Sequence, residues 1–259
     1  MVIPLNSEVV LTPPVDAATV MVVRDAAQGL EVLLVRRHGN SGVLGGVHVF
    51  PGGKLDAADC AAQPDWLDRP PESFQDALAE PGLDPVVAVG LHVAALRETC
   101  EECGLRLAPT QLVPWSRWVT PRQPSVTHKR FDTRFFVAPA PVGQEAVHDD
   151  HEATEVVWTS PRAGLERYWA GEIDLAPPQI MSLVQLVRLS DVAHVMAVAR
   201  SRTPVLIEPQ PFDLDGERVI CYPGDPSHPV RVAAWQGPTR LSYRNRRFEA
   251  DGGLAALLG

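Results

Sequence analysis

The chain has 259 residues, of which 45% are apolar and 21% are charged, and its formal net charge is −9. These are ordinary globular values, and they exclude a disordered, collagen-like or coiled-coil chain. A chain this acidic is poorly suited to following a nucleic-acid backbone, so no nucleic-acid partner is expected. A few local Arg or Lys side chains can still hold a small phosphate compound.

The first half of the chain begins with strand signals. Two runs of β-branched and apolar residues, 17–24 and 31–37, are separated by Ala-Gln-Gly and predict a β-hairpin. A third short run, 47–50, leads into Pro51-Gly52-Gly53. Residues 60–84 are rich in proline, alanine and acids, and they predict an insertion at the surface with one short helix.

A helix is then predicted over 85–103. Asp84 is a suitable N-cap, Pro85 favours the first helical position, and Gly104 favours the end. The rest of the chain carries similar signals. They predict strands at 111–119, 126–138 and 154–159, helices from Pro161 to Gly171 and from Pro177 to about Arg200 with a break near Ser190-Asp191, and a hairpin around Asp215-Gly216.

This order of elements predicts one domain over 1–200 with an insertion at about 60–84, followed by a β-rich extension over 201–259 that packs on the same domain. No membrane partner is expected, because the longest nearly apolar stretch, 86–96, is far short of the ~18 residues that a membrane helix needs. Neither end carries a targeting signal, so the expected location is cytoplasmic.

Three carboxylates gather at the end of the predicted 85–103 helix. Glu98, Glu101 and Glu102 stand at i, i+3 and i+4, so they project from one helical face with Cβ atoms about 5–6 Å apart. Like charges so placed repel one another, and the helix macrodipole is unfavourable to them. A hard cation such as Mg²⁺ or Mn²⁺ offsets this repulsion, because it prefers oxygen ligands. Arg97 can bridge the carboxylates from the flank, and a solvated acidic helix end is the alternative interpretation.

A glycine-rich segment upstream, 52–59, completes a recognisable pattern. Together with the helix end it resembles the box of the Nudix hydrolases, G-x5-E-x7-R-E-U-x-E-E-x-G-U, where U is apolar. Gly53 takes the first position, and Asp59 stands where the box has Glu. Thr99 replaces an apolar residue, and about 30 residues interrupt the box. The second half of the box matches at Arg97, Glu98, Glu101, Glu102, Gly104 and Leu105.

An interrupted box is similar to the branch of that family that includes the peroxisomal coenzyme A diphosphatases. Four further stretches agree with that branch in order and spacing, so the resemblance covers about residues 17–200. These stretches are VLLVRRHGNSGVLGGVHVFPGGKLDAAD, RFDTRFFVA, EVVWTSP and IDLAPPQ. The resemblance implies a Nudix-type α/β/α sandwich with a mixed sheet, and hydrolysis of a diphosphate joined to a further group X.

The resemblance also implies roles for particular residues. Metals held by Glu98, Glu101 and Glu102, with Arg97 in the same catalytic set, would orient the diphosphate and lower the pKa of the attacking water. The general base is often a Glu from a loop outside the box. Glu152 and Glu155 are the candidates here, and each is otherwise a solvated loop acid.

Several other residues are candidates for substrate contact. The backbone at Gly52 and Gly53 is suited to approaching metal or phosphate, and Arg side chains bind phosphate in bidentate fashion. A surface position or a structural ion pair is the alternative for each basic residue. Arg36 and Arg130 are the preferred ones, and the others are Arg37, Lys129 and Arg134. The insertion, which interrupts the box, is expected to form a wall for the X group, and a flexible surface loop is the alternative.

Cys100 and Cys103 form a CxxC pair, which is compatible with a redox pair or with half of a zinc site. No second CxxC and no HxxxH follows, and the pair lies at a helix C-terminus beside Glu101 and Glu102. Such surroundings disfavour a thiolate, so a structural role is expected.

The leading functional hypothesis is an Mg²⁺- or Mn²⁺-dependent diphosphatase that acts on CoA or acyl-CoA and gives 3′,5′-ADP and (acyl-)4′-phosphopantetheine. The same metal site is also compatible with a small-molecule nucleoside diphosphate substrate of another kind, namely ADP-ribose, a dinucleotide or a nucleotide sugar. A Nudix module that senses a nucleotide without cleaving it is the alternative of another class. Family resemblance also makes a homodimer possible.

Overall fold

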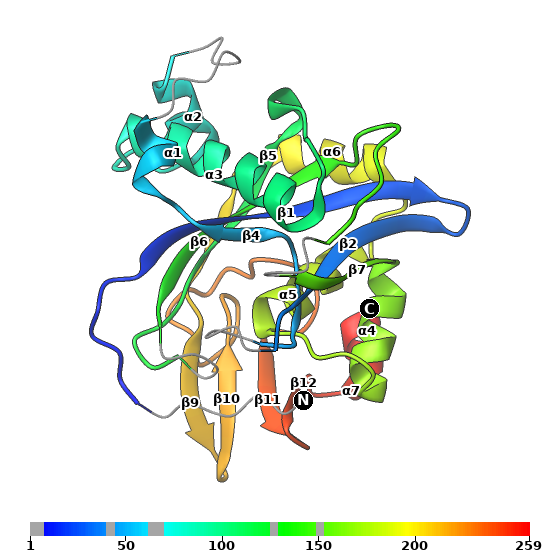
Figure 1. Ribbon diagram of the computed structural model, residues 1–259. Coiled ribbons are helices and arrows are strands. Elements are labelled where there is room, and N and C mark those ends of the chain that lie inside the picture. The colour runs from blue at the N-terminus through cyan, green and yellow to red at the C-terminus, as the bar shows by residue number, and fades with distance from the viewer. Residues whose placement is uncertain (1–7, 40–44, 62–69, 125–128, 149–152) are drawn as a thin grey trace.

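The computed structural model describes residues 8–39, 45–61, 70–124, 129–148 and 153–259, and the following account concerns those residues. Its centre is a mixed sheet (Figure 1). The strands of this sheet are β1 (Val15–Ala26), β2 (Gly29–Arg37), β3 (His48–Val49), β4 (Gly52–Lys54), β5 (Val113–Val119), β6 (Phe131–Pro139), β7 (Ala153–Thr159) and β8 (Val205–Ile207).

The strand order is β3-β2-β1-β6-β5-β8, with β4 paired to β1 and β7 paired to β2. β1 and β6 are parallel, as are β5 and β8, while the other pairs are antiparallel. The hairpin predicted for the first two strands is confirmed. β5 begins later than predicted because Pro109–Gln111 forms a short 3-10 helix in front of it.

Helices cover both faces of the sheet. Along β1 the buried side chains alternate, so Val20 and Val22 pack against α3 (Pro85–Cys103), while Met21 and Val23 face the opposite side. The second face is covered by α4 (Pro161–Ala170), α5 (Pro177–Leu186) and α6 (Val192–Ser201). The α/β/α sandwich expected from the sequence is therefore confirmed.

The bounds of α3 agree with the prediction because both ends carry local signals. The Asp84 side chain accepts a hydrogen bond from the Val86 N–H at 2.8 Å, and Gly104 adopts the left-handed conformation (φ +70°) that ends the helix. The break predicted between α5 and α6 is also present, where the Asp191 side chain accepts from the His194 N–H and begins α6. No helix in the described ranges is long and apolar enough to span a membrane.

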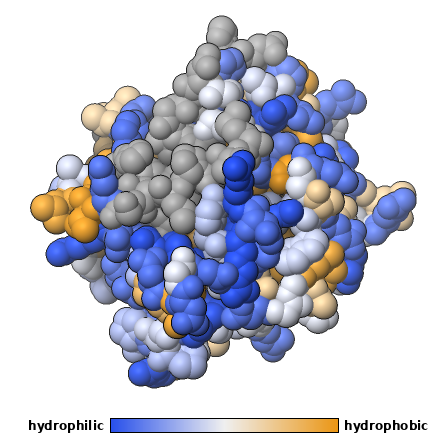
Figure 2. Space-filling model, turned by 90° about the horizontal axis from the view of Figure 1, so that it is seen from below, coloured by the Kyte–Doolittle hydropathy of each residue, from blue (hydrophilic) through white to orange (hydrophobic). Residues whose placement is uncertain are grey.

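The C-terminal extension forms a second, antiparallel sheet and a last helix. Its elements are β9 (Gln210–Leu214), β10 (Glu217–Cys221), β11 (Arg240–Arg244), β12 (Arg247–Glu249) and α7 (Gly253–Leu258). Tyr222, Leu241 and Phe248 are buried in the same cluster as Trp118 of the main sheet, so the extension shares the core of the domain. The face of the molecule seen from below in Figure 2 is mostly hydrophilic, with small, separate apolar areas.

The insertion lies at the surface and is anchored to the domain at a few points. It contains α1 (Ala57–Ala61) at its start and α2 (Glu72–Leu78), whereas 62–69 lie outside the described residues. Phe74 and Leu78, at i and i+4 on α2, are buried against α3. Glu80 forms ion pairs of 2.7 Å with both Arg117 and Arg134. Most described residues of 70–84 are nevertheless exposed or half-buried, α2 lies wholly within the insertion, and only the last two residues of α1, 60–61, belong to it. The prediction of a surface insertion with one short helix is therefore confirmed for the described part.

Candidate active site

The two halves of the interrupted box meet where β4 runs beside the end of α3. The Gly52 N–H donates a hydrogen bond of 2.9 Å to Oε2 of Glu102. A Cβ atom on Gly53 would lie 2.1 Å from Oε1 of Glu98, and one on Gly52 would lie 2.4 Å from the carbonyl oxygen of Ala18. Only glycine therefore allows β4 to pass between β1 and the helix carboxylates.

The three carboxylates of α3 differ in their surroundings. Glu98 and Glu102 are almost fully buried, with 8% and 2% of their surface exposed. The Glu101 side chain is 57% exposed. Burying two anions so close together is costly unless they are paired, so the neighbouring cations and N–H groups are part of the site.

Arg97 is the cation at the centre of this cluster. Its Nη1 lies 2.9 Å from Oε1 of Glu98 and 2.9 Å from Oε2 of Glu101. Its Nε and Nη2 donate to the two carboxylate oxygens of Asp59, both at 2.9 Å. These bonds, with that to Asp59 the largest influence, raise the pKa of Arg97. The predicted bridging role of Arg97 is therefore present in the structure.

Asp59, which stands at the first acidic position of the box, lies beside Arg97 of the second half. The residue is buried, which by itself would raise its pKa, but the hydrogen bonds from Arg97 and from the Asp56 N–H outweigh burial and hold the pKa of Asp59 below its usual value. Asp59 is thus an anion whose contact is with Arg97.

The chemistry of these side chains fits a hard divalent cation, because all the donors are carboxylate oxygens and two of them are buried. They do not converge on one point in this structure, since Glu98 and Glu101 contact Arg97 while Glu102 contacts Gly52. Within the described ranges, no group of three or more His, Cys, Asp or Glu side chains is arranged to hold a metal ion. The assignment of the three glutamates as metal ligands stays a prediction.

Glu155, one of the two candidate bases, lies apart from this cluster. Its carboxylate is 4.0 Å from Arg36 and 3.8 Å from Nε2 of His48, on strands β2 and β3. The register of β2 against β7 shifts between Arg36 and Arg37, and the Nη1 of Arg37 lies 3.9 Å from Glu102. The structure therefore does not bring Glu155 to the helix carboxylates. Glu152 lies outside the described residues.

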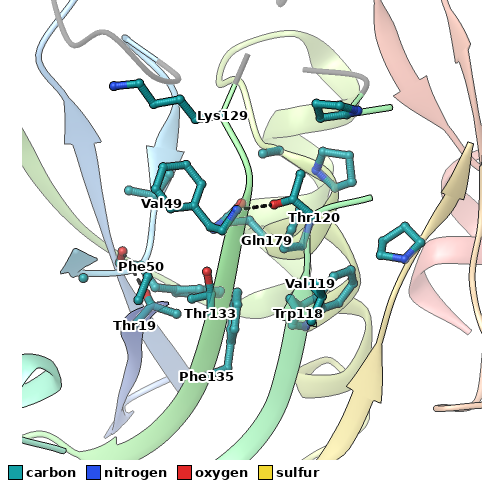
Figure 3. Close-up of a pocket in the computed structure, with 18 of the residues that line it drawn as sticks. Thr19, Val49, Phe50, Trp118, Val119, Thr120, Lys129, Thr133, Phe135 and Gln179 are labelled. Carbon is teal, nitrogen blue, oxygen red and sulfur yellow. Dashed lines mark hydrogen bonds between the residues drawn. The ribbon is translucent and has the colours of Figure 1, made fainter. Parts of the chain in front are cut away.

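A cavity of about 410 Å³ lies on the other side of β4. Gly52, Gly53, Lys54 and Arg37 line it where it adjoins the carboxylates. Figure 3 shows Lys129 at one end of the view, Trp118 and Phe135 towards the other, and Gln179 between them. Most of its wall is apolar and comes from several elements. The wall includes Val49, Phe50, Trp118, Phe131, Phe135, Ala176, Pro177, Pro178, Pro209, Pro211 and Ile220.

Arg36 and Arg130, the two basic residues predicted to contact the substrate, do not line the cavity. Arg130 is buried and donates to the carbonyl oxygens of Thr120 and Thr12, so it holds backbone segments together. Arg36 pairs with Glu155 and is not in the lining of the cavity. The basic residues that do line the cavity are Arg37, Lys54 and Lys129. Arg134 pairs with Glu80, Asp16 and Asp132.

The wall of the cavity also differs from the expectation. No described residue of the 60–84 insertion lines it, whereas Pro209, Pro211 and Ile220 of the C-terminal extension do. The prediction that the insertion forms a wall for the X group is therefore wrong for the described residues, because Phe74 and Leu78 anchor α2 against α3, on the opposite face of the sheet.

Sequence reasoning missed Gln179. It is the third residue of α5, lines the cavity and is 8% exposed, and its Oε1 has no hydrogen-bond partner among the described residues. The available signal was the segment Ala176-Pro177-Pro178-Gln179, which indicated only the start of a helix.

The CxxC pair has the expected structural character. Both thiols are free. Cys103 is fully buried, and its Sγ donates to the carbonyl oxygen of Thr99 at 2.9 Å. Burial, more than the nearby Glu102, raises the pKa of Cys103 to about 12.

Comparison with known proteins shows which family the chain resembles. A model of the NUDT19 Nudix domain matches residues 110–186. A Nudix hydrolase from Alicyclobacillus acidocaldarius has a similar structure, with a TM-score of 0.57 and 26% identity, over 75% of this chain and 98% of the other. The chain is similar to the Nudix hydrolases in sequence and in fold. The matched region begins after α3 and does not include the Nudix box. The box is therefore supported by its own residues and by the contacts described above.

Curated relatives of the chain show which branch of the Nudix hydrolases it resembles. The acyl-coenzyme A diphosphatase NUDT19 of Gallus gallus is 26% identical in an alignment 239 residues long, gaps included, which covers 62% of this chain and 62% of the relative. The NUDT19 of Homo sapiens is 26% identical in an alignment 250 residues long, gaps included, which covers 68% of this chain and 66% of the relative. The resemblance to the coenzyme A diphosphatases is confirmed. The chain spans slightly less than two thirds of the length of these relatives.

Proposed function

We propose that this protein is a metal-dependent Nudix diphosphatase that cleaves coenzyme A or an acyl-CoA into 3′,5′-ADP and (acyl-)4′-phosphopantetheine. The observation that carries the proposal is the contact of Gly52 and Gly53 with Glu102 and Glu98. This contact assembles the interrupted box and puts it beside a cavity large enough for a ligand, since ligand sites measure about 300–1,000 Å³. The printed activity of the relatives, acyl-CoA diphosphatase, supports this class of substrate.

Glu98, Glu101 and Glu102 are the residues that would hold Mg²⁺ or Mn²⁺. A bound cation would supply charge neutralisation at the diphosphate and a lower pKa for the attacking water. Arg97 holds two of these carboxylates in place and balances their charge. The glycines of β4 keep the backbone close to the carboxylates without obstructing side chains.

The cations at the cavity are placed to bind phosphate oxygens. Arg37 lines the cavity and lies 3.9 Å from Glu102, so a phosphate beside the carboxylates would be within reach of its guanidinium. Lys54 and Lys129 line the same cavity and add positive charge. They counter the acidic balance of the whole chain at the place where an anionic substrate would enter.

The test is product release from CoA, ADP-ribose and NADH, each with Mg²⁺, with Mn²⁺ and with a chelator, followed by chromatography. We expect 3′,5′-ADP and 4′-phosphopantetheine from CoA, only when metal is present. Calorimetric titration with Mn²⁺ gives a second readout, and Glu98→Gln should weaken metal binding. Glu166→Gln, which removes an exposed charge from α4, is the matched control.

Two outcomes would contradict the proposal. Faster cleavage of ADP-ribose or NADH than of CoA would favour a nucleoside diphosphatase of another specificity. Tight binding of CoA without any cleavage, in the presence of bound metal, would favour a sensing module.

A further inference from the structure

The cavity has two chemically different regions. Where it adjoins β4, it is lined by glycine backbone and by Arg37 and Lys54. On the far side of β1 and β6 from β4 it is bounded by Trp118 of β5 and by Pro209, Pro211 and Ile220 of the C-terminal extension. A substrate whose diphosphate lies at the charged region would therefore extend its X group into the apolar region. This step rests on the proposed function.

Two of the three threonine hydroxyls in the wall, those of Thr19 and Thr120, are already engaged. The Oγ1 of Thr19 donates to the carbonyl oxygen of Pro51 at 2.8 Å, and the Oγ1 of Thr120 accepts from the Phe131 N–H at 3.0 Å. Gln179 differs from them, because its buried Oε1 has no hydrogen-bond partner among the described residues. A buried acceptor without a partner is unusual, and in a cavity it indicates a donor that a ligand supplies.

The side-chain amide of Gln179 also limits which ligand group it can recognise. It offers one acceptor oxygen and two N–H donors on a neutral planar group. A secondary amide, which has one N–H and one carbonyl, is complementary to it. A phosphate is not, because phosphate presents acceptors only and prefers the cations at the other region.

The aromatic rings favour a flexible chain over a flat base. Trp118 stacks on Trp235 with ring centres 5.9 Å apart and an angle of 17°, so one face of its ring is covered. Phe50 and Phe135 meet edge to face, at 6.4 Å and 85°. The rings of Trp118, Phe50 and Phe135 are therefore partly covered by neighbouring rings, which leaves less ring face open for stacking on an adenine. Apolar walls with one amide suit methylene segments joined by an amide.

We propose that Gln179 is a specificity residue that accepts a hydrogen bond from an amide N–H in the X arm of the substrate. The cavity between the main sheet, α5 and the C-terminal extension is then the site for a pantetheine-like chain. In CoA this chain is the pantetheine arm, which lies on the side of the diphosphate away from the adenosine. The C-terminal extension is then part of the substrate site through Pro209, Pro211 and Ile220.

The test compares the two halves of the substrate as separate ligands of the full chain. Inhibition constants for 4′-phosphopantetheine and for 3′,5′-ADP are measured for the parent and for Gln179→Leu, together with calorimetric binding of pantetheine alone. We expect Gln179→Leu to raise the KM for CoA and the inhibition constant of 4′-phosphopantetheine about tenfold, as for the loss of one hydrogen bond. The constant for 3′,5′-ADP should change less than twofold.

Gln185→Leu is the matched control. Gln185 is on the same helix, is similarly buried and does not line the cavity, so this variant should leave both constants unchanged. If Gln179→Leu does not fold, Gln179→Met replaces it, since Met keeps the length of the side chain and removes the amide.

The outcomes separate this inference from the proposed function. If the parent cleaves CoA but the constant for 4′-phosphopantetheine does not change, or both constants rise equally, the inference is overturned and the function stands. A rise for 3′,5′-ADP alone would show that Gln179 binds the adenine, which also overturns it. If the parent cleaves no CoA yet binds pantetheine in a Gln179-dependent way, the inference stands and the function fails. Absence of both cleavage and binding overturns both.

Discussion

Arg97 donates two parallel hydrogen bonds of 2.9 Å to Asp59, across 38 positions of the chain. Asp59 ends the first half of the interrupted box, and Arg97 begins the second. Bidentate Arg–carboxylate pairs combine charge with fixed geometry, so this pair holds the two halves together despite the residues inserted between them. A shortened Asp at this position is sufficient because α1 brings its carboxylate directly to the guanidinium.

Asp59→Asn should destabilise the protein. The change removes the charge that pairs with Arg97 and leaves the guanidinium with weaker acceptors, at a cost of about 1–3 kcal/mol in the free energy of unfolding. Denaturant titration measures this directly. The exposed pair Arg162–Glu166 provides the control, since Glu166→Gln should change stability little. An unchanged denaturation midpoint for Asp59→Asn would show that the pair does not hold the box together.

The same pair predicts a pH dependence. The pKa of Asp59 is lower in the folded chain than its usual value, so the unfolded chain binds the proton more readily. The stabilising contribution is therefore complete above the usual pKa of Asp, about 3.9, and is lost as pH falls towards the folded value. The difference in stability between the parent and Asp59→Asn should shrink over that interval. A difference that stays constant down to pH 3 would contradict this assignment.

Glu101→Gln and Glu102→Gln should each lower kcat by at least ~10²-fold, because each removes a charge that the metal-assisted reaction requires. Glu101→Gln should hardly change the free energy of unfolding, because Glu101 is largely exposed. Glu102→Gln should also change the free energy of unfolding little, because the buried glutamine can still accept the hydrogen bond from the Gly52 N–H. Steady-state kinetics at saturating metal and thermal melts check both statements. Near-normal turnover in both folded variants would refute the metal site.

Gly53→Ala tests the close approach of β4 to α3. The added methyl group would lie 2.1 Å from the Glu98 carboxylate and must displace it. A displacement of about 1 Å at a catalytic group lowers turnover by about 10²-fold. Gly82→Ala is the control, because a Cβ atom there meets nothing within 4 Å. Equal kcat values for Gly53→Ala and the parent would show that Glu98 has no fixed role.

The double variant Cys100→Ser, Cys103→Ser should keep most metal-dependent activity. Cys103 is buried and donates to Thr99, and a serine hydroxyl can make the same bond at the cost of a polar group in an apolar cluster. The expected loss is about 1 kcal/mol of stability. Stoichiometric zinc in the parent, lost together with activity in the double variant, would show that the pair is a metal site.

The sequence determined the local features of this protein. The bounds of α3 follow from Asp84, Pro85 and Gly104, because capping groups act within one helical turn. The common face of Glu98, Glu101 and Glu102 follows from helical spacing alone. For the same reason the first hairpin and the break before α6 agree with prediction.

Only the tertiary structure decided which residues surround the cavity. β2 is buried on both faces, so its sequence does not show that Arg37 faces Glu102 while Arg36 faces Glu155. Gln179 meets Pro209 and Ile220 across a space formed by elements far apart in the chain. Such proximity depends on long-range packing of sheet, helix and extension, and no local pattern of side chains encodes it.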